Sequence, residues 1–335
     1  MYSRKFSKGI YKNHPSRRMI SSTVLQYPLL EAPSHQQETE ISPMENRKKR
    51  WGDRRDARWV REVDGLHAMF PHLMPKRTDA EVYINIDLDV TDTLAYIARK
   101  NQSGSEYRTT LFHCMLMAIA KTVYLRPNLN RYISGRRYYQ RHRITLGFVA
   151  KRRFEDHSEE TLIVAEAPED WTLSAATERV AGTVHKVREG TSYGLDGTLN
   201  FLKHMPRFVM MFIMWCFRAL DFFGKMPRSL TEDDTNYATV LLTNLGSIKC
   251  PSIYHHLNNY GTNSIIAAIG TIHKAEIIGE DGTRRVRDVV DLGVTIDERI
   301  ADGFYFARSL KIVQYMLANP ALLERPLKEE IDFVC

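Results

Sequence analysis

Apolar and polar residues follow regular patterns along most of the chain after residue 80. Strict alternation over residues 82–90 predicts a strand with one buried face. Apolar spacing predicts a helix at Thr91–Lys100, with Leu94, Ile97 and Ala98 facing inward. Similar patterns predict helices at Leu111–Val123 and Leu173–Val187, and strands at Tyr132–Tyr139, Ile144–Ala150, Thr161–Glu166, Ala238–Thr243 and Ser264–Ile269.

The last ninety residues contain a buried strand, a charged turn and a helix. Val286–Ile296 is apolar and β-branched enough for a strand, and Gly279–Gly282 predicts a hairpin turn before it. Apolar residues at 304, 307, 310, 313 and 317 predict a helix that Asn319 and Pro320 end. The turn between strand and helix is Asp297–Gly303. Such a turn is more often a solvated cap, but loops of this kind also display reactive side chains.

One apolar run, Phe208–Phe217, has no obvious place in this pattern. Its ten residues are too few to span a bilayer, which needs about twenty. Three interpretations remain open for the segment 205–224: a buried helix in the core or between subunits, a Met- and aromatic-rich wall for an apolar acyl group, and a helix lying on a membrane surface. The membrane contact is the least favoured of the three.

Charge is concentrated at the N-terminus. The net charge is +7, and residues 1–58 hold thirteen Lys and Arg against six Asp and Glu, so the remainder of the chain sums to zero. A neutral body without a nucleic-acid motif argues against nucleic-acid binding. Residues 1–50 lack apolar periodicity and predict a disordered basic tail, followed by one domain over 51–330. The tail also resembles an organellar transit peptide, although an extension upstream of a start at Met44 is the favoured interpretation.

The four cysteines, Cys114, Cys216, Cys250 and Cys335, lie far apart without paired histidines. This spacing argues against a metal site or a disulfide framework, and it favours a reducing, cytoplasmic compartment.

Two motifs resemble those of the 2-oxoacid dehydrogenase acyltransferase catalytic domain, in the chloramphenicol acetyltransferase-like superfamily. The first is Glu298–Gly303, similar to the family's H-x-x-x-D-G motif with Glu298 in place of the histidine. The second is Leu242–Gly246, similar to the family's S/T-x-L-G segment. Weaker likenesses at Asp89–Thr91 and Arg126–Asn130 extend the resemblance over roughly residues 80–325.

The resemblance implies an α/β two-layer sandwich, a mixed sheet with helices on one face. It implies transfer of an acyl group from acyl-coenzyme A at a site between subunits of a homotrimer. By position, Glu298 takes the place of the base, Thr243 that of the oxyanion donor, and Asp302 that of the aspartate that holds the site through an arginine, for which Arg77 and Arg61 are the nominations. Asn244 and Gly303 fall at the substrate-binding positions.

Several departures from the family limit what the resemblance implies. The sequence predicts a stand-alone catalytic domain, without a recognisable lipoyl or subunit-binding module before it, and a helical insertion at about 190–234 that contains the apolar run. Residues 151–156 replace the family's G-L-x-x-P-V, which favours a small-molecule acceptor other than lipoamide and no covalently bound lipoate. An ordinary glutamate is also a poorer base than histidine. The alternative is therefore a catalytically silent trimeric binding or assembly protein, and the acyl group and acceptor stay open.

Other polar residues have weaker claims to a function. His255 and His256 are a reserve base, and Arg299 is an alternative partner that would neutralise Glu298. His113, on an apolar helix, is interpreted as a satisfied core histidine. Four basic residues could either contact the phosphates of coenzyme A or lie on an exposed hairpin face, and the hairpin interpretation is favoured. They are Lys249, Arg284, Arg285 and Arg287.

Overall fold

The computed structural model describes residues 48–151, 155, 160–189, 197, 202–278 and 282–333. Nearly all of the predicted disordered tail at 1–50 lies outside these residues. So do Cys335, most of 152–159, and Gly279–Asp281 of the predicted hairpin turn.

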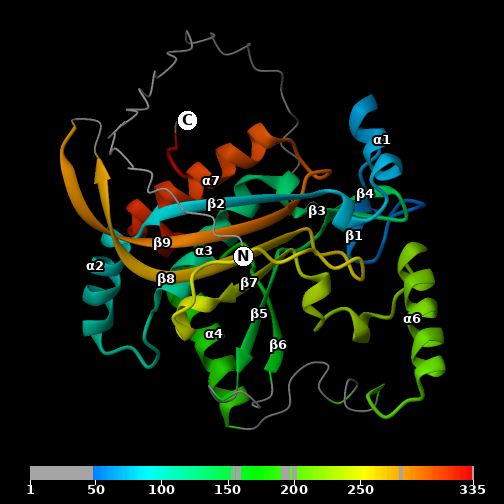
Figure 1. Cartoon of the computed structure of the whole chain (residues 1–335), viewed down its shortest axis with the longest axis horizontal. Helices are drawn as coiled ribbons and strands as arrows, with labels where there is room; N and C mark the ends of the chain where they lie inside the picture. The colour runs from blue at the N-terminus through cyan, green and yellow to red at the C-terminus, as the bar shows by residue number, and fades with distance from the viewer. Residues whose placement is uncertain are drawn as a thin grey trace, which may run out of the picture. The chain divides into compact units, whose positions relative to one another are not determined.

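Six strands form the main sheet, in the order β2-β9-β8-β7-β5-β6 (Figure 1). The strand β7 pairs in parallel with β5 and β8, and the other neighbours are antiparallel, so the sheet is mixed. The strands are β2 (Glu81–Asp89), β5 (Thr145–Lys151), β6 (Glu160–Glu166), β7 (Val240–Asn244), β8 (Ile265–Ile278) and β9 (Arg284–Asp297). Each predicted strand of this sheet is present.

Four helices cover one face of the main sheet (Figure 1). Helix α3 lies between α2, α4 and α7, and eleven of its residues are buried. One core cluster fills the space between the helices and the sheet. The helices are α2 (Thr91–Lys100), α3 (Leu111–Leu125), α4 (Leu173–Arg188) and α7 (Gly303–Ala318). The predicted two-layer α/β class, with helices on one face of a mixed sheet, is confirmed.

The predicted helices are present, and Ile97, Val313 and Leu317 are buried as expected, but some of the predicted inward positions are exposed. In α7, Phe304 and Ala307 are exposed, while Phe306 and Ser309 are buried. In α2, Ala98 is exposed, and Thr93 is buried instead with its hydroxyl donating to the carbonyl of Leu317. Small polar residues therefore occupy buried positions because helix carbonyls accept their hydroxyl protons.

A second, three-stranded sheet has the order β1-β4-β3. It consists of β1 (Ala57–Trp59), β3 (Arg131–Ser134) and β4 (Arg137–Arg141), with helix α1 (Gly65–Leu73) beside it. The prediction of one strand over Tyr132–Tyr139 is wrong. Gly135 and Arg136 both have positive φ, 56° and 60°, so the chain turns there and forms a tight hairpin.

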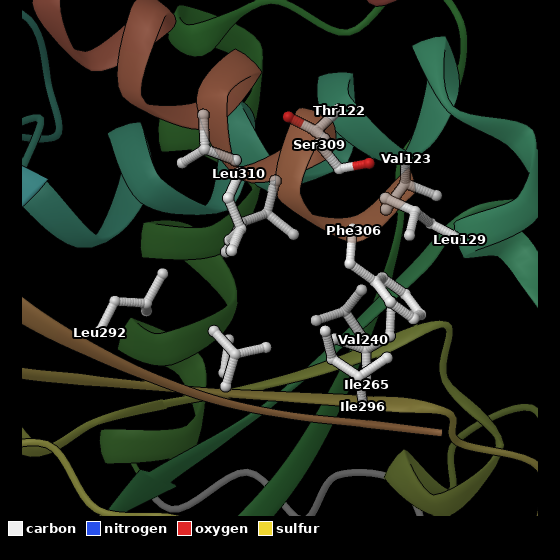
Figure 2. Close-up of a pocket in the computed structure, with 14 residues that line it drawn as sticks. Thr122, Val123, Leu129, Val240, Ile265, Leu292, Ile296, Phe306, Ser309 and Leu310 are labelled. Carbon is white, nitrogen blue, oxygen red and sulfur yellow. The ribbon is translucent and has the colours of Figure 1, made fainter. Parts of the chain in front are cut away.

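A small cavity of about 60 Å³ remains in the core between the main sheet, α3 and α7. Figure 2 shows Phe306, Val240 and Ile265 among the side chains around it. The hydroxyls of Thr122 and Ser309 bond to carbonyls of their own helices. The cavity is therefore an apolar gap in the packing, and none of the predicted site residues lines it.

Helix α6 (Arg207–Phe222) contains the apolar run and has no buried residue. The interpretation of this run as a buried core helix is therefore wrong for the single chain. Within the described residues, no helix is both long and apolar enough to cross a membrane.

Candidate active site

The motif turn joins the end of β9 to the start of α7 at one end of the main sheet. The backbone N–H of Glu298 donates to the carbonyl of Ala80 at 2.9 Å, which anchors the turn to the start of β2. The Glu298 side chain is exposed, whereas its neighbours Asp297 and Arg299 are buried. The turn therefore presents the Glu298 carboxylate outward from a fixed backbone.

Asp297 and Arg299 form a fully buried ion pair beneath this turn. The Arg299 Nε and Nη2 atoms donate to the two Asp297 oxygens at 2.7 and 2.6 Å, and Nη1 donates to the carbonyl of Met74 at 2.6 Å. The exposed fractions of the two side chains are 0% for Asp297 and 1% for Arg299. Arg299 therefore neutralises Asp297 rather than Glu298, and the alternative Glu298–Arg299 pair is wrong.

Asp302 caps helix α7. Its Oδ1 accepts the backbone N–H of Tyr305 at 2.7 Å, and the helix begins at Gly303. Neither nominated arginine reaches Asp302 in this chain: Arg77 donates to the carbonyls of Ile133 and Asn258, and Arg61 donates to Trp51. Those two nominations are wrong, because both guanidinium groups are occupied by backbone carbonyls elsewhere.

Thr243 and Asn244 form the end of β7. Thr243 is half-buried and Asn244 is exposed. Strand register places Thr243 beside Ala268 and, one strand further, beside Gly293. Glu298 lies five residues beyond Gly293, or about 17 Å along the strands at ~3.3 Å per residue. A single chain therefore keeps Thr243 and Glu298 well apart.

The segment at 250–260 crosses the face of the sheet that the four helices leave uncovered. It lies so close that a Cβ atom added at Gly270 would meet the Ser252 nitrogen at 2.5 Å, and one at Gly293 would meet the Ile253 oxygen at 2.6 Å. Further on, the Leu257 backbone N–H donates to Glu81. The sequence signal for this path was present in the two glycines, which interrupt otherwise apolar strands.

His255, the reserve base, lies in this segment. Its side chain is half-buried, its Nε2 atom has no hydrogen-bond partner within the described residues, and burial lowers the pKa of His255. His256 is exposed. Among the described residues of the single chain, no recorded contact joins either histidine to Glu298 or Thr243, so one chain does not bring them into one site.

The other candidates have structural explanations. His113 is buried, its Nδ1 accepts the Thr110 backbone N–H at 3.1 Å, and burial lowers its pKa to about 4, as a core histidine requires. Arg284 and Arg287 pair with acids on neighbouring elements, which supports the hairpin-face interpretation. Across the described residues, no group of three His, Cys, Asp or Glu side chains is placed to hold a metal ion.

The fold resembles those of known acyltransferase cores. It is similar to that of a probable dihydrolipoamide acetyltransferase from Listeria monocytogenes, at 16% identity and a TM-score of 0.52, over 78% of this chain and 94% of that one. It is also similar to the dihydrolipoamide acetyltransferase of Azotobacter vinelandii, at 14% identity and a TM-score of 0.51, over 79% of this chain and 93% of that one. The chain therefore has an acyltransferase-core fold.

The sequence comparison identifies the family that it resembles. Residues 225–324 match the sequence model of the 2-oxoacid dehydrogenases acyltransferase catalytic domain, and they include both motifs. The chain is also 21% identical over 252 residues to the lipoamide acyltransferase component of the branched-chain alpha-keto acid dehydrogenase complex of Bacillus subtilis. That match covers 73% of this chain and 49% of the relative, so the chain spans about half the relative's length. The resemblance to this catalytic domain is confirmed.

Proposed function

We propose that the protein is a coenzyme A-dependent acyltransferase with a small-molecule acceptor other than lipoamide, acting between subunits of a homotrimer. The observation that carries the proposal is the exposed, unneutralised Glu298 on a turn held by the buried Asp297–Arg299 pair. Within the described residues, no side chain pairs with the Glu298 carboxylate. A fixed backbone with a free carboxylate is what a positioned general base requires.

The proposed reaction divides the work between two groups. Glu298 takes the proton of the acceptor's thiol, hydroxyl or amine as the acceptor atom bonds to the acyl carbon of the thioester. The Thr243 hydroxyl donates to the oxyanion of the tetrahedral intermediate. The carbon–sulfur bond then breaks, and the departing coenzyme A thiolate takes the proton back from Glu298. Asn244 follows Thr243, and Gly303 ends the motif turn that carries Glu298; these two residues are the proposed substrate contacts.

The register of the sheet supports a site shared between chains. Thr243 and Glu298 are separated by about 17 Å along the strands, so one chain does not complete the site. In a cyclic trimer, the motif turn of one subunit and the Thr243 segment of the next form the same contact three times. In the Azotobacter relative, crystallographic and enzymatic work concerns a serine, a histidine and an asparagine in the catalytic mechanism. Thr243, Glu298 and Asp302 are the proposed counterparts.

The choice of acceptor rests on the departure from the family at residues 151–156. Only Lys151 and Glu155 of this segment lie within the described residues. The charged residues there replace an apolar, proline-containing stretch, which removes the likeness to the lipoamide-using relatives at this position. The proposed acceptor is therefore a small molecule rather than a lipoyl group.

The test uses two inactive variants that should complement each other when they assemble into mixed trimers. Glu298→Gln and Thr243→Ala should each reduce transfer from acetyl-coenzyme A by at least about 100-fold, because each removes a group that acts in the transition state. Coexpression of the two variants should restore about a quarter of the wild-type activity, because a quarter of randomly assembled interfaces carry both intact groups. Light scattering checks that each variant remains a trimer. Activity of the two variants equal to wild type would refute the catalytic roles.

The alternative is a catalytically silent trimeric binding or assembly protein. It is favoured by one observation: no described side chain orients the Glu298 carboxylate, whereas catalytic bases are usually held by a third group. In that case Glu298→Gln has no measurable effect, and Asp302→Ala affects folding alone through loss of the α7 cap.

A further inference from the structure

Helix α6 exposes a continuous apolar arc. At 100° per residue, positions 208, 211, 212, 215, 219 and 222 fall within one third of its circumference. The large side chains of this arc and the residue after it are between 53% and 74% exposed: Phe208, Met211, Phe212, Trp215, Phe222 and Phe223. Such an arc is too regular to be scattered surface apolarity.

The size of this surface sets it apart from ordinary exposed apolar residues. At roughly 200 Å² for each large side chain, six of them about two-thirds exposed present on the order of 700–800 Å². The largest apolar patch on a typical monomer is about 300–600 Å². The α6 surface therefore needs a covering partner.

Basic residues lie beside the arc. Residues 203–228 contain five Lys and Arg and one acid, Asp221, and one of the five, Arg228, pairs with Glu232 at 2.5 Å. Asp221 is half-buried and bonds to Arg54 at 2.9 Å, so it does not oppose the positive charge at the surface. Arg207 and Arg218 lie at one edge of the arc, and Arg218 is exposed. Apolar aromatic residues beside exposed arginines are the pattern of helices that lie in the headgroup region of a bilayer.

A second helix near α6 also exposes apolar side chains. In α1, Leu66, Met69 and Leu73 recur at helical spacing and are 56–63% exposed. The β3–β4 turn joins α1 to α6: Arg136 contacts His72 of α1 at 3.4 Å. On the other side of the same turn, a Cβ added at Gly135 would lie 2.6 Å from the carbonyl oxygen of Phe222. Figure 1 shows α1 and α6 at the same end of the domain.

We propose that α6, continued by α1, docks this domain on a membrane surface that carries anionic phospholipid headgroups. The aromatic and Met side chains enter the boundary between headgroups and acyl chains, and Arg207 and Arg218 contact the phosphates. Helix α6 lies in the plane of the surface. A second copy of the chain fits this face less well, because α6 packed against its own counterpart would bring two sets of arginines together.

The test is flotation of the full-length protein with vesicles of phosphatidylcholine alone or with about 30% phosphatidylglycerol added. The wild type should float with the anionic vesicles and much less with the neutral ones. Phe212→Ser/Trp215→Ser should reduce flotation about tenfold or more, and Arg207→Glu/Arg218→Glu should remove the preference for anionic vesicles. Val286→Ser is the matched control, since Val286 is 70% exposed on a strand outside this surface and should float like the wild type.

Other outcomes would overturn the proposal. One is wild-type protein that stays with the unbound fraction, and another is flotation that the serine variant retains. Light scattering without lipid tests whether a second copy of the chain covers the α6 surface instead. In that case the wild type does not float, and the serine variant forms smaller oligomers than the wild type. Acetyl transfer in solution is measured on the same preparations, so failure of the docking proposal and failure of the proposed reaction give different results.

Discussion

The motif turn and helix α6 reverse the usual relation between polarity and burial. The turn is among the most charged segments of the chain, yet Asp297 and Arg299 are fully buried. Helix α6 is among the most apolar, yet none of its residues is buried. The Asp297 carboxylate has its partner two residues away within the turn, whereas the partner that we propose for α6 lies outside the single chain. Burial therefore follows the available partner rather than polarity alone.

The largest expected effect comes from breaking the buried pair. Arg299→Met should lower the free energy of unfolding by about 3–5 kcal/mol, because it leaves the Asp297 carboxylate buried without a counter-charge. Urea denaturation measures this. Arg308→Met, on the exposed side of α7, is the control and should change stability by less than about 0.5 kcal/mol. The double variant Asp297→Asn/Arg299→Met should recover part of the loss; a loss equal to the sum of the single variants would show that the two groups act independently.

A smaller effect is expected where a buried polar group has no charged partner. The pKa of His113 falls from about 6.5 in the unfolded chain to about 4 in the folded protein because of burial. The unfolded chain therefore binds the extra proton first, so this contribution is complete above pH 6.5 and decreases as the pH falls toward 4. The expected loss is about 2 kcal/mol at pH 5 and about 3 kcal/mol at pH 4. Urea denaturation of wild type and His113→Gln at both pH values isolates this contribution, and equal pH dependence in the two proteins would contradict it.

The smallest effect is expected for an apolar side chain of helix α6. Phe212→Ser should change the free energy of unfolding by less than about 0.5 kcal/mol without lipid, because the side chain is already 63% exposed in the folded chain. The same substitution in a core helix costs several kcal/mol. Thermal unfolding at several protein concentrations is the measurement. A large loss that grows on dilution would show that Phe212 is buried between subunits.

Most of the main sheet and its helices could be predicted from the sequence, because their apolar periodicity agrees with what they bury. Residues 82–90 alternate as a strand with one buried face must, and α2 and α3 begin where their patterns begin. One error occurred where strand-favouring residues lie on both sides of a change of direction. Tyr132 and Ile133 precede Gly135 and Tyr138 and Tyr139 follow it, so only the positive φ of the turn separates the two strands.

The candidate site was predictable as a list of residues and not as a set of contacts. Glu298, Asp302 and Thr243 came from motif positions, whereas the pairing of Arg299 depends on Asp297, which adjoins the motif and was given no role. Spacing in the sequence did not show that Arg77 would bond to backbone carbonyls. The side of α6 that faces outward also depends on what the rest of the chain leaves uncovered.

The close seating of residues 251–253 over Gly270 and Gly293 has a consequence for engineering. The backbone of this segment packs directly on the backbone of the sheet, because the two glycines have no Cβ atoms to hold it further away. Ile253 and Tyr254 are 42% and 49% exposed, and the Tyr254 ring lies 5.3 Å from the ring of Tyr83 on β2. A library that randomises Ile253 and Tyr254 can therefore change the side chains on this face while the backbone contact with Gly270 and Gly293 stays the same.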